Sequence, residues 1–133
     1  MYIGGGNTFR LLAEIRKYGF EPALQDFAYR GKPIYGGSAG AAILGRDIRT
    51  VNHIDNDDVG LMNTSALDLA NGHSVWVHYQ PQDDALIHAC VLKYQHPVLA
   101  LSERSGIALE NVGVRSIGFE PAFRFDMREK LQL

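Results

Sequence analysis

A glycine-rich turn around Ser38 limits the folds open to this chain more than any other segment. The turn reads Gly36-Gly37-Ser38-Ala39-Gly40, a G-x-S-x-G motif that follows an apolar strand pattern and precedes a helical one. A strand that bends sharply into a helix strains the central residue, so the neighbours two positions away must be small. This context predicts Ser38 as a nucleophile and the N–H of Ala39 as a donor to an oxyanion. The alternative interpretation is a tight turn with an incidental serine.

A second glycine-rich turn, Gly4-Gly5-Gly6-Asn7, follows a short apolar segment at residues 1–3. Three glycines at the end of a strand leave backbone N–H groups uncovered, and Asn7 or Thr8 would begin a helix directly afterwards. Such a turn suits a phosphate, half of an oxyanion hole, or a plain reversal of the chain. It lacks the G-x-G-x-x-G spacing of a dinucleotide site, and no Walker lysine follows it.

A serine nucleophile needs a base, and the sequence offers five histidines. His78 directly follows the apolar strand pattern of residues 75–77, at the carboxyl end of the strand, where the sites of α/β proteins are built. His88 falls within a helical pattern and His96 precedes a proline, so we expect surface positions for both. His78 is therefore the predicted base.

The base in turn needs an acid that holds its tautomer. Glu103 lies just past the apolar strand pattern of residues 98–101, at a position comparable to that of His78. The competing acids are Asp55, Asp57 and Asp58, a cluster that is more typical of a solvated loop. No ligand spacing in the chain indicates a metal site.

Strand and helix patterns alternate, which predicts one α/β domain over residues 1–133 with a partly parallel sheet. The spacing of apolar residues predicts helices from residue 8 to 19, from 22 to 31 and from 83 to 94. Residues 107–109 and 114–117 are expected to form an antiparallel hairpin, whereas residues 46–71 have the weaker pattern of a polar, partly extended loop.

Composition and charge exclude several classes of function. A net charge of −2 and a pI near 6.2 give no basic surface for nucleic acid or for an anionic membrane. No segment approaches the roughly 20 apolar residues that cross a bilayer, and no signal peptide is expected at the N-terminus. The single cysteine, Cys90, lies in an apolar stretch. Together these features predict a soluble, cytoplasmic protein.

Five blocks, in this order and spacing, resemble the dipeptidase E-like serine peptidases of peptidase family S51. They are Gly4-Gly5-Gly6-Asn7-Thr8-Phe9, Gly37-Ser38-Ala39-Gly40-Ala41, Ile48-Arg49-Thr50 with Asn52, the strand that ends in His78, and Val98-Leu99-Ala100-Leu101-Ser102-Glu103. The predicted hairpin also fits, so the resemblance covers nearly the whole chain. Cyanophycinase, a relative, has a similar serine turn and is a weaker match.

The resemblance implies a three-layer, class-I-amidotransferase-like (flavodoxin-like) fold, with a mostly parallel sheet and a C-terminal antiparallel hairpin. It also implies Ser38 as the nucleophile, His78 as the base and Glu103 as the acid. The resemblance also places His53 at the other acidic position of the family, which leaves Asp55 as the alternative acid.

The same resemblance implies an oxyanion hole formed by backbone N–H groups of Ala39, Gly5 and Gly6, with Asn7 beside them in the substrate-binding turn. It implies neither a metal nor an organic cofactor. The expected activity is hydrolysis of small peptides by a serine nucleophile.

The chain departs from the family in two respects. The segment after the base, His78-Tyr79-Gln80-Pro81-Gln82-Asp83-Asp84, carries two acids and no arginine, so a preference for N-terminal aspartate is not expected. The two acids could instead begin a helix. The chain also starts at the first glycine turn, so we expect an N-terminally shortened family member that forms a homodimer. The alternative is a shortened, non-catalytic binding or oligomerisation module.

Overall fold

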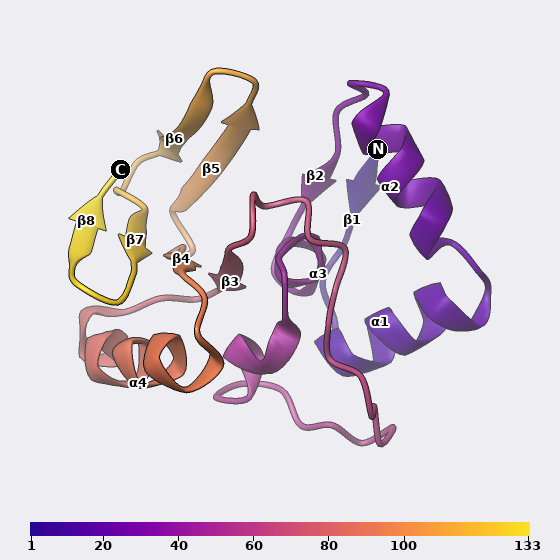
Figure 1. Cartoon of the computed structure of the whole chain (residues 1–133), viewed down its shortest axis with the longest axis horizontal. Helices are drawn as coiled ribbons and strands as arrows, with labels where there is room; N and C mark the ends of the chain where they lie inside the picture. The colour runs from indigo at the N-terminus through magenta and orange to yellow at the C-terminus, as the bar shows by residue number, and fades with distance from the viewer.

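The computed structural model describes all residues from 1 to 133 and consists of short strands that alternate with helices (Figure 1). The strands are β1 (Tyr2–Ile3), β2 (Tyr35–Gly36), β3 (Ser74–Trp76), β4 (Val98–Ala100), β5 (Ser105–Glu110), β6 (Gly113–Gly118), β7 (Phe123–Phe125) and β8 (Lys130–Gln132). The helices are α1 (Thr8–Lys17), α2 (Glu21–Tyr29), α3 (Ala39–Leu44) and α4 (Asp84–Tyr94), with 3₁₀ turns η1 (Ile48–Val51) and η2 (Pro81–Asp83). The predicted helices and the predicted hairpin are present.

Hydrogen bonds group the strands into three sheets. β1 pairs with β2 in parallel, and β3 pairs with β4 in parallel. β4 continues into an antiparallel arrangement with β7 and β8, while β5 and β6 form a separate antiparallel hairpin. The α/β alternation thus agrees with the prediction, and the sheets are mixed. The strands β7 and β8 were not predicted. The prediction of a mostly parallel sheet is wrong, because β7 and β8 extend the β3–β4 pair with antiparallel neighbours. The three-layer, flavodoxin-like arrangement stays a prediction.

Local sequence signals fix the ends of α1. The side chain of Asn7 accepts a hydrogen bond from the N–H of Arg10 at 3.0 Å, which caps the first turn of the helix. The helix ends before Gly19, which adopts a positive φ of 69°. α1 therefore starts and stops where these residues predict.

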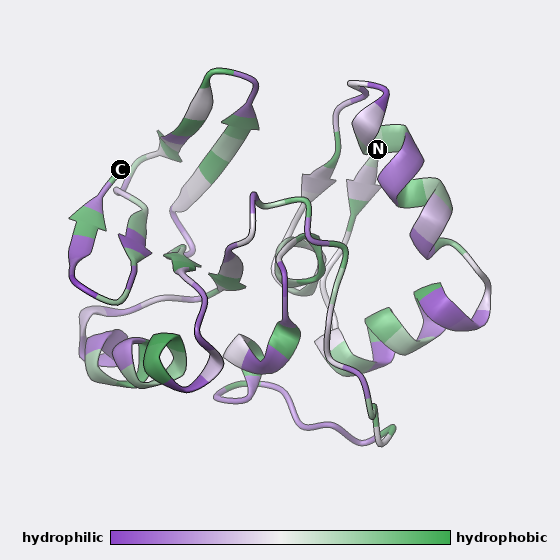
Figure 2. Cartoon of the chain, in the orientation of Figure 1, coloured by the Kyte–Doolittle hydropathy of each residue, from purple (hydrophilic) through white to green (hydrophobic).

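Residues 46–71 contribute more to the core than a polar loop would. The segment buries several apolar side chains against α1 and α3: Ile48, Val51, Ala66, Leu67 and Ala70. Figure 2 shows α3, seen end-on near the centre, as a mostly apolar helix. Apart from η1 the segment is a loop, as predicted, but its predicted polar character is wrong for these residues, because apolar side chains without a regular period can still pack against neighbouring elements.

His96 also differs from its prediction. It is buried, and its Nδ1 lies 3.1 Å from the hydroxyl oxygen of Ser74. Burial lowers the pKa of this imidazole.

None of the helices is long and apolar enough to span a membrane.

Candidate active site

Ser38 occupies the turn between β2 and α3 with φ 51° and ψ −114°, a conformation that side chains rarely adopt. A Cβ on Gly40 would lie 2.1 Å from the carbonyl oxygen of Ile3, and one on Gly36 would lie 2.5 Å from that of Gly40. Both positions therefore require glycine. The strained backbone of Ser38 thus belongs to a residue whose side chain lies beside His78.

A chain of hydrogen bonds joins Ser38, His78 and Glu103. The Oγ of Ser38 lies 2.9 Å from Nε2 of His78, and Nδ1 of His78 lies 3.2 Å from Oε1 of Glu103. In the tautomer that these contacts require, His78 donates from Nδ1 to the carboxylate and accepts the serine proton at Nε2.

The sheet explains why the histidine and the acid meet. His78 follows β3 and Glu103 follows β4, and these two strands are parallel neighbours. Their carboxyl ends therefore lie side by side, as the sequence pattern predicted. The His78 side chain is 40% exposed and that of Glu103 is 78% exposed, so the pair is open to solvent.

The first glycine turn lies against the serine. A Cβ on Gly5 would lie 3.5 Å from Cβ of Ser38 and 3.9 Å from its Oγ. The N–H groups of Gly5 and Gly6 donate no hydrogen bond within the chain. Ala39 is the first residue of α3, where an N–H has no carbonyl one helical turn earlier. The predicted oxyanion donors are therefore free of partners within the chain, and the Gly5 turn lies beside Ser38; their role stays a prediction.

Asn7 uses its side chain to shape the turn. Its Oδ1 caps α1, and its Nδ2 donates to the carbonyl of Asn56 at 2.9 Å. Both polar atoms of the Asn7 side chain thus have partners within the chain, and the predicted role of Asn7 beside the substrate stays a prediction.

The alternative acid lies elsewhere. Asp55 accepts hydrogen bonds from the N–H and the hydroxyl of Thr8, at 2.8 and 2.6 Å, at the start of α1. His53, at the other acidic position of the family, stacks on Trp76 with ring centroids 3.8 Å apart and donates to the carbonyl of Thr50. Among the candidate acids, only Glu103 contacts His78. No group of three or more His, Cys, Asp or Glu side chains comes together as a metal site.

The two acids after His78 have structural partners. Asp83 accepts hydrogen bonds from the N–H of Gln80 and the indole N–H of Trp76, at 2.9 and 3.3 Å. Asp84 pairs with Lys130 at 2.7 Å and accepts a hydrogen bond from the phenol hydroxyl of Tyr79. Burial opposes the ionisation of Asp84, but the hydrogen bonds from Lys130 and Tyr79 outweigh it and lower the pKa of the carboxyl. Both carboxylates therefore have partners within the chain, Asp83 just before α4 and Asp84 against β8.

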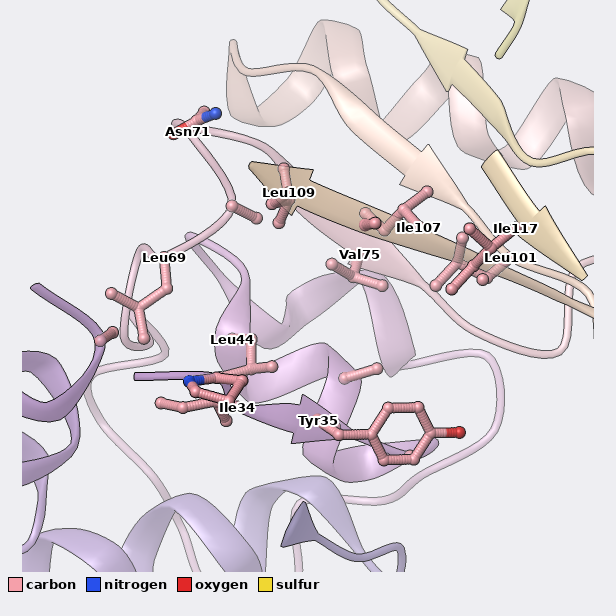
Figure 3. A pocket seen from close by; sticks show the side chains of 18 of the residues that line it. Ile34, Tyr35, Leu44, Leu69, Asn71, Val75, Leu101, Ile107, Leu109 and Ile117 are labelled. Carbon is pink, nitrogen blue, oxygen red and sulfur yellow. The ribbon is translucent and has the colours of Figure 1, made fainter. Parts of the chain in front are cut away.

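A cleft of about 1010 Å³ opens next to the three joined side chains, and Ser38, His78 and Glu103 all line it. Figure 3 shows apolar side chains of β5 and β6 facing others from β2, α3 and the loop before β3. The labelled apolar lining residues are Ile34, Tyr35, Leu44, Leu69, Val75, Leu101, Ile107, Leu109 and Ile117. This cleft was not predicted from the sequence, although Ile107 and Leu109 alternate along β5 as residues of one sheet face do.

Residues 1–117 of the chain match the sequence model of peptidase family S51. The chain belongs to this family. The family prediction made from the glycine turns and the two strand ends is thereby confirmed.

Similar proteins carry the name peptidase E. Peptidase E of Shewanella oneidensis is 28% identical over 130 residues, which cover 92% of this chain and 55% of the relative. Peptidase E of Shewanella sp. strain ANA-3 is 48% identical over 50 residues, or 38% of this chain and 21% of the relative. The chain thus spans about half the length of the Shewanella oneidensis protein.

The fold is also similar to a crystal structure of a protein described as a peptidase E, from Listeria monocytogenes EGD-e. The two structures superpose with a TM-score of 0.71 at 29% identity, over 90% of this S51 chain and 59% of the other. The S51 chain therefore has an α/β fold similar to that of a peptidase E structure.

Proposed function

We propose that this chain hydrolyses a peptide bond in small peptides, with Ser38 as the nucleophile, His78 as the base and Glu103 as the acid that orients it. The observation that carries the proposal is the 2.9 Å contact between Ser38 Oγ and His78 Nε2. This distance allows direct proton transfer from the hydroxyl to the imidazole. Membership of a peptidase family supports the same chemistry.

In the first half of the reaction, Ser38 Oγ attacks the peptide carbonyl carbon while His78 Nε2 takes the hydroxyl proton. The oxyanion accepts hydrogen bonds from the N–H of Ala39 and from that of Gly5 or Gly6. Nε2–H then protonates the amide nitrogen, the C–N bond breaks, and the amine leaves. An acyl group remains on Ser38.

In the second half, water attacks the ester carbonyl and gives its proton to Nε2. The tetrahedral intermediate collapses, Oγ takes back a proton from His78, and the carboxylic acid leaves. Glu103 stabilises the imidazolium in both halves through Nδ1.

The test is a hydrolysis screen over a dipeptide library with wild type, Ser38→Ala and Glu103→Gln. We expect Ser38→Ala to lose activity by about 10³-fold or more. We expect Glu103→Gln to lose roughly 10- to 100-fold in kcat, because a carboxylate that water reaches stabilises the imidazolium less than a buried one.

Circular dichroism and thermal melting of all three proteins serve as the control for folding. If all three fold and none cleaves a peptide or reacts with a serine-directed phosphonate, the chain is the non-catalytic module instead. Activity that survives Ser38→Ala would also overturn the proposed nucleophile.

We propose further that the chain self-associates. Tyr2 and Tyr35 are 66% and 65% exposed and stack on each other at 5.4 Å, on a two-stranded sheet that has open edges. A homodimer would cover this surface. A monomer at micromolar concentration in sedimentation velocity would contradict the proposal.

The single free cysteine supports the proposal of a reducing, cytoplasmic location. Burial raises the pKa of the Cys90 thiol, and no second cysteine is available within the chain to form a disulfide. Fractionation of the source cells tests this location.

A further inference from the structure

The proposed hydrolysis does not specify which side chains the substrate carries, but the lining of the cleft beside Ser38 indicates one of them. We propose that it binds a large apolar side chain next to the scissile bond, so that the preferred substrates are peptides with leucine, isoleucine or phenylalanine there. The inference rests on the proposed function and names the substrate class of the same site.

Chain topology identifies the end of the cleft that lies nearest the joined side chains. β5 starts two residues after Glu103, and Gly106 pairs with Ile117, so Ile117 lies at the base of the hairpin. Leu101 ends the segment that leads to Glu103, and Tyr35 precedes Ser38 by three residues. In Figure 3, Tyr35, Leu101 and Ile117 lie toward one end of the cleft and Leu69, Leu109 and Asn71 toward the other.

The surface at the end near Ser38 is apolar and accessible. Ile117 is 40% exposed, although it lies within the cleft. A ligand side chain that covers Ile117 removes its apolar surface from water as well as the ligand's own. Continuity of this surface with Ser38 and His78 favours the substrate as its occupant.

The charges of the cleft oppose an acidic side chain. Its charged lining residues are one cation, Lys32, and three carboxylates, Asp68, Glu103 and Glu110, and no arginine lines it. The Nζ of Lys32 lies over the ring of Phe27 at 5.3 Å, on α2. Lys32 precedes β2, whereas Ser38 follows it, so a substrate carboxylate placed at the end near Ser38 would lose water without gaining a cation.

The arginine next to Glu103 does not change this balance. Arg104 pairs with Glu120 at 3.8 Å and lies over the ring of Phe119, and it is not part of the cleft lining. Recognition of an acidic side chain normally uses a guanidinium or an ammonium group aimed at the ligand. The cleft offers no such group at the end near Ser38.

The first arm of the test compares kcat/KM for dipeptides with leucine, phenylalanine or aspartate at either position. We expect the best apolar peptide to exceed every aspartyl peptide by about tenfold or more. The order of residues in the best substrate identifies the side of the scissile bond that enters the cleft. If an aspartyl peptide is cleaved best, the inference is wrong while the proposed hydrolysis stands.

The second arm uses a matched pair of charge insertions on one hairpin. Ile117→Arg places a cation in the cleft, whereas Val112→Arg adds the same charge at the exposed hairpin turn, outside the cleft lining. We expect Ile117→Arg to reduce the ratio of apolar to aspartyl hydrolysis by about tenfold and Val112→Arg to leave it unchanged. Equal ratios in both variants would overturn the inference.

A binding measurement keeps the inference testable even without turnover. In the Ser38→Ala background, titration calorimetry should detect binding of Leu-Leu and not of Asp-Asp, and Ile117→Arg should abolish the Leu-Leu signal. Failure of Leu-Leu to bind contradicts the inference. The inference is also contradicted if Ile117→Arg converts a dimer into a monomer. That result would show that a second copy of the chain, and not a substrate, occupies the cleft.

Discussion

At the scale of single residues, the site depends on how closely β1, the Ser38 turn and α3 approach one another. The N–H of Gly37 donates to the carbonyl of Ile3 at 3.0 Å, which ties the turn to β1. Gly40 leaves no space for a side chain against that same carbonyl. The close contact also brings the Gly5 turn to the serine, so backbone packing and the geometry of the oxyanion donors depend on the same glycines.

Gly40→Ala should therefore damage both stability and activity. Its Cβ would lie 2.1 Å from the carbonyl oxygen of Ile3, so β1 and α3 must separate. We expect the free energy of unfolding to fall by about 2 kcal/mol, with loss of peptidase activity, measured by urea denaturation and a kinetic assay. Gly4→Ala is the control, since its Cβ would meet only the Tyr2 ring, at 3.6 Å. Equal stability of the two variants would contradict the argument.

At the scale of elements, the C-terminal strand β8 braces the segment that carries His78. Lys130 of β8 donates to the phenol oxygen of Tyr79 at 2.6 Å and to both carboxylate oxygens of Asp84 on α4. Tyr79 directly follows His78, and its N–H donates to the carbonyl of Leu101 at 2.8 Å. One cluster of charged and phenolic groups thus holds α4, β8 and the segment that carries His78, the proposed base.

Lys130→Met tests this brace. It keeps an unbranched side chain but leaves Asp84 without its cation, so we expect a loss of about 1 kcal/mol in unfolding free energy. We also expect a several-fold lower kcat with little change in KM, because His78 loses positional support and the cleft is untouched. Lys93→Met, at an exposed position of α4, is the control and should change neither quantity. A pure stability loss with unchanged kcat would show that Lys130 acts on the fold alone.

The sequence predicts some elements of this molecule far better than others. The Ser38 turn could be predicted because its steric requirements lie within five consecutive residues, and His78 and Glu103 because each follows an apolar strand. β7 and β8 were missed because three-residue strands carry almost no period, and they form only because β7 pairs with β4 and β8 with β7. The cleft was missed because its walls come from segments about 70 residues apart, which only the tertiary fold brings together.

At the scale of the whole molecule, β3 and β4 separate two hydrophobic clusters. Val75 and Leu99 point into the larger cluster with α1 and α3, whereas Trp76, Val98 and Ala100 point into the smaller one beside α4. Alternate residues of β3 and β4 therefore pack into opposite clusters. Because the same backbone supports the two, we expect the chain to unfold in one transition.

Stability should fall on mild acidification. Burial is the main cause that lowers the pKa values of His53 and His96 from the ordinary value of 6.5, so the folded chain holds both rings neutral. Below pH 6.5 these two histidines bind protons in the unfolded chain but not in the folded chain, so the free energy of unfolding falls as the pH falls. Each ring contributes at most about 1.4 kcal/mol per pH unit. The lowered pKa of Asp84 acts in a more acidic range, below its ordinary value of 3.8.

The measurement is urea denaturation at several pH values between about 7.5 and 5. The variant His96→Asn should flatten the dependence, because it removes one of the two groups. An unchanged slope in that variant would show that burial of His96 does not contribute to the acid sensitivity.

Ser38 and His78 both adopt positive φ angles, 51° and 55°. Glycine avoids the clash that any L side chain meets there, which costs roughly 1–2 kcal/mol per residue. In evolutionary terms, a lineage that did not need the proposed peptide hydrolysis would be free to replace both residues by glycine and to become more stable. Serine and histidine at these two positions thus lower the free energy of unfolding relative to glycine. Such residues are expected where selection acts on what their side chains do.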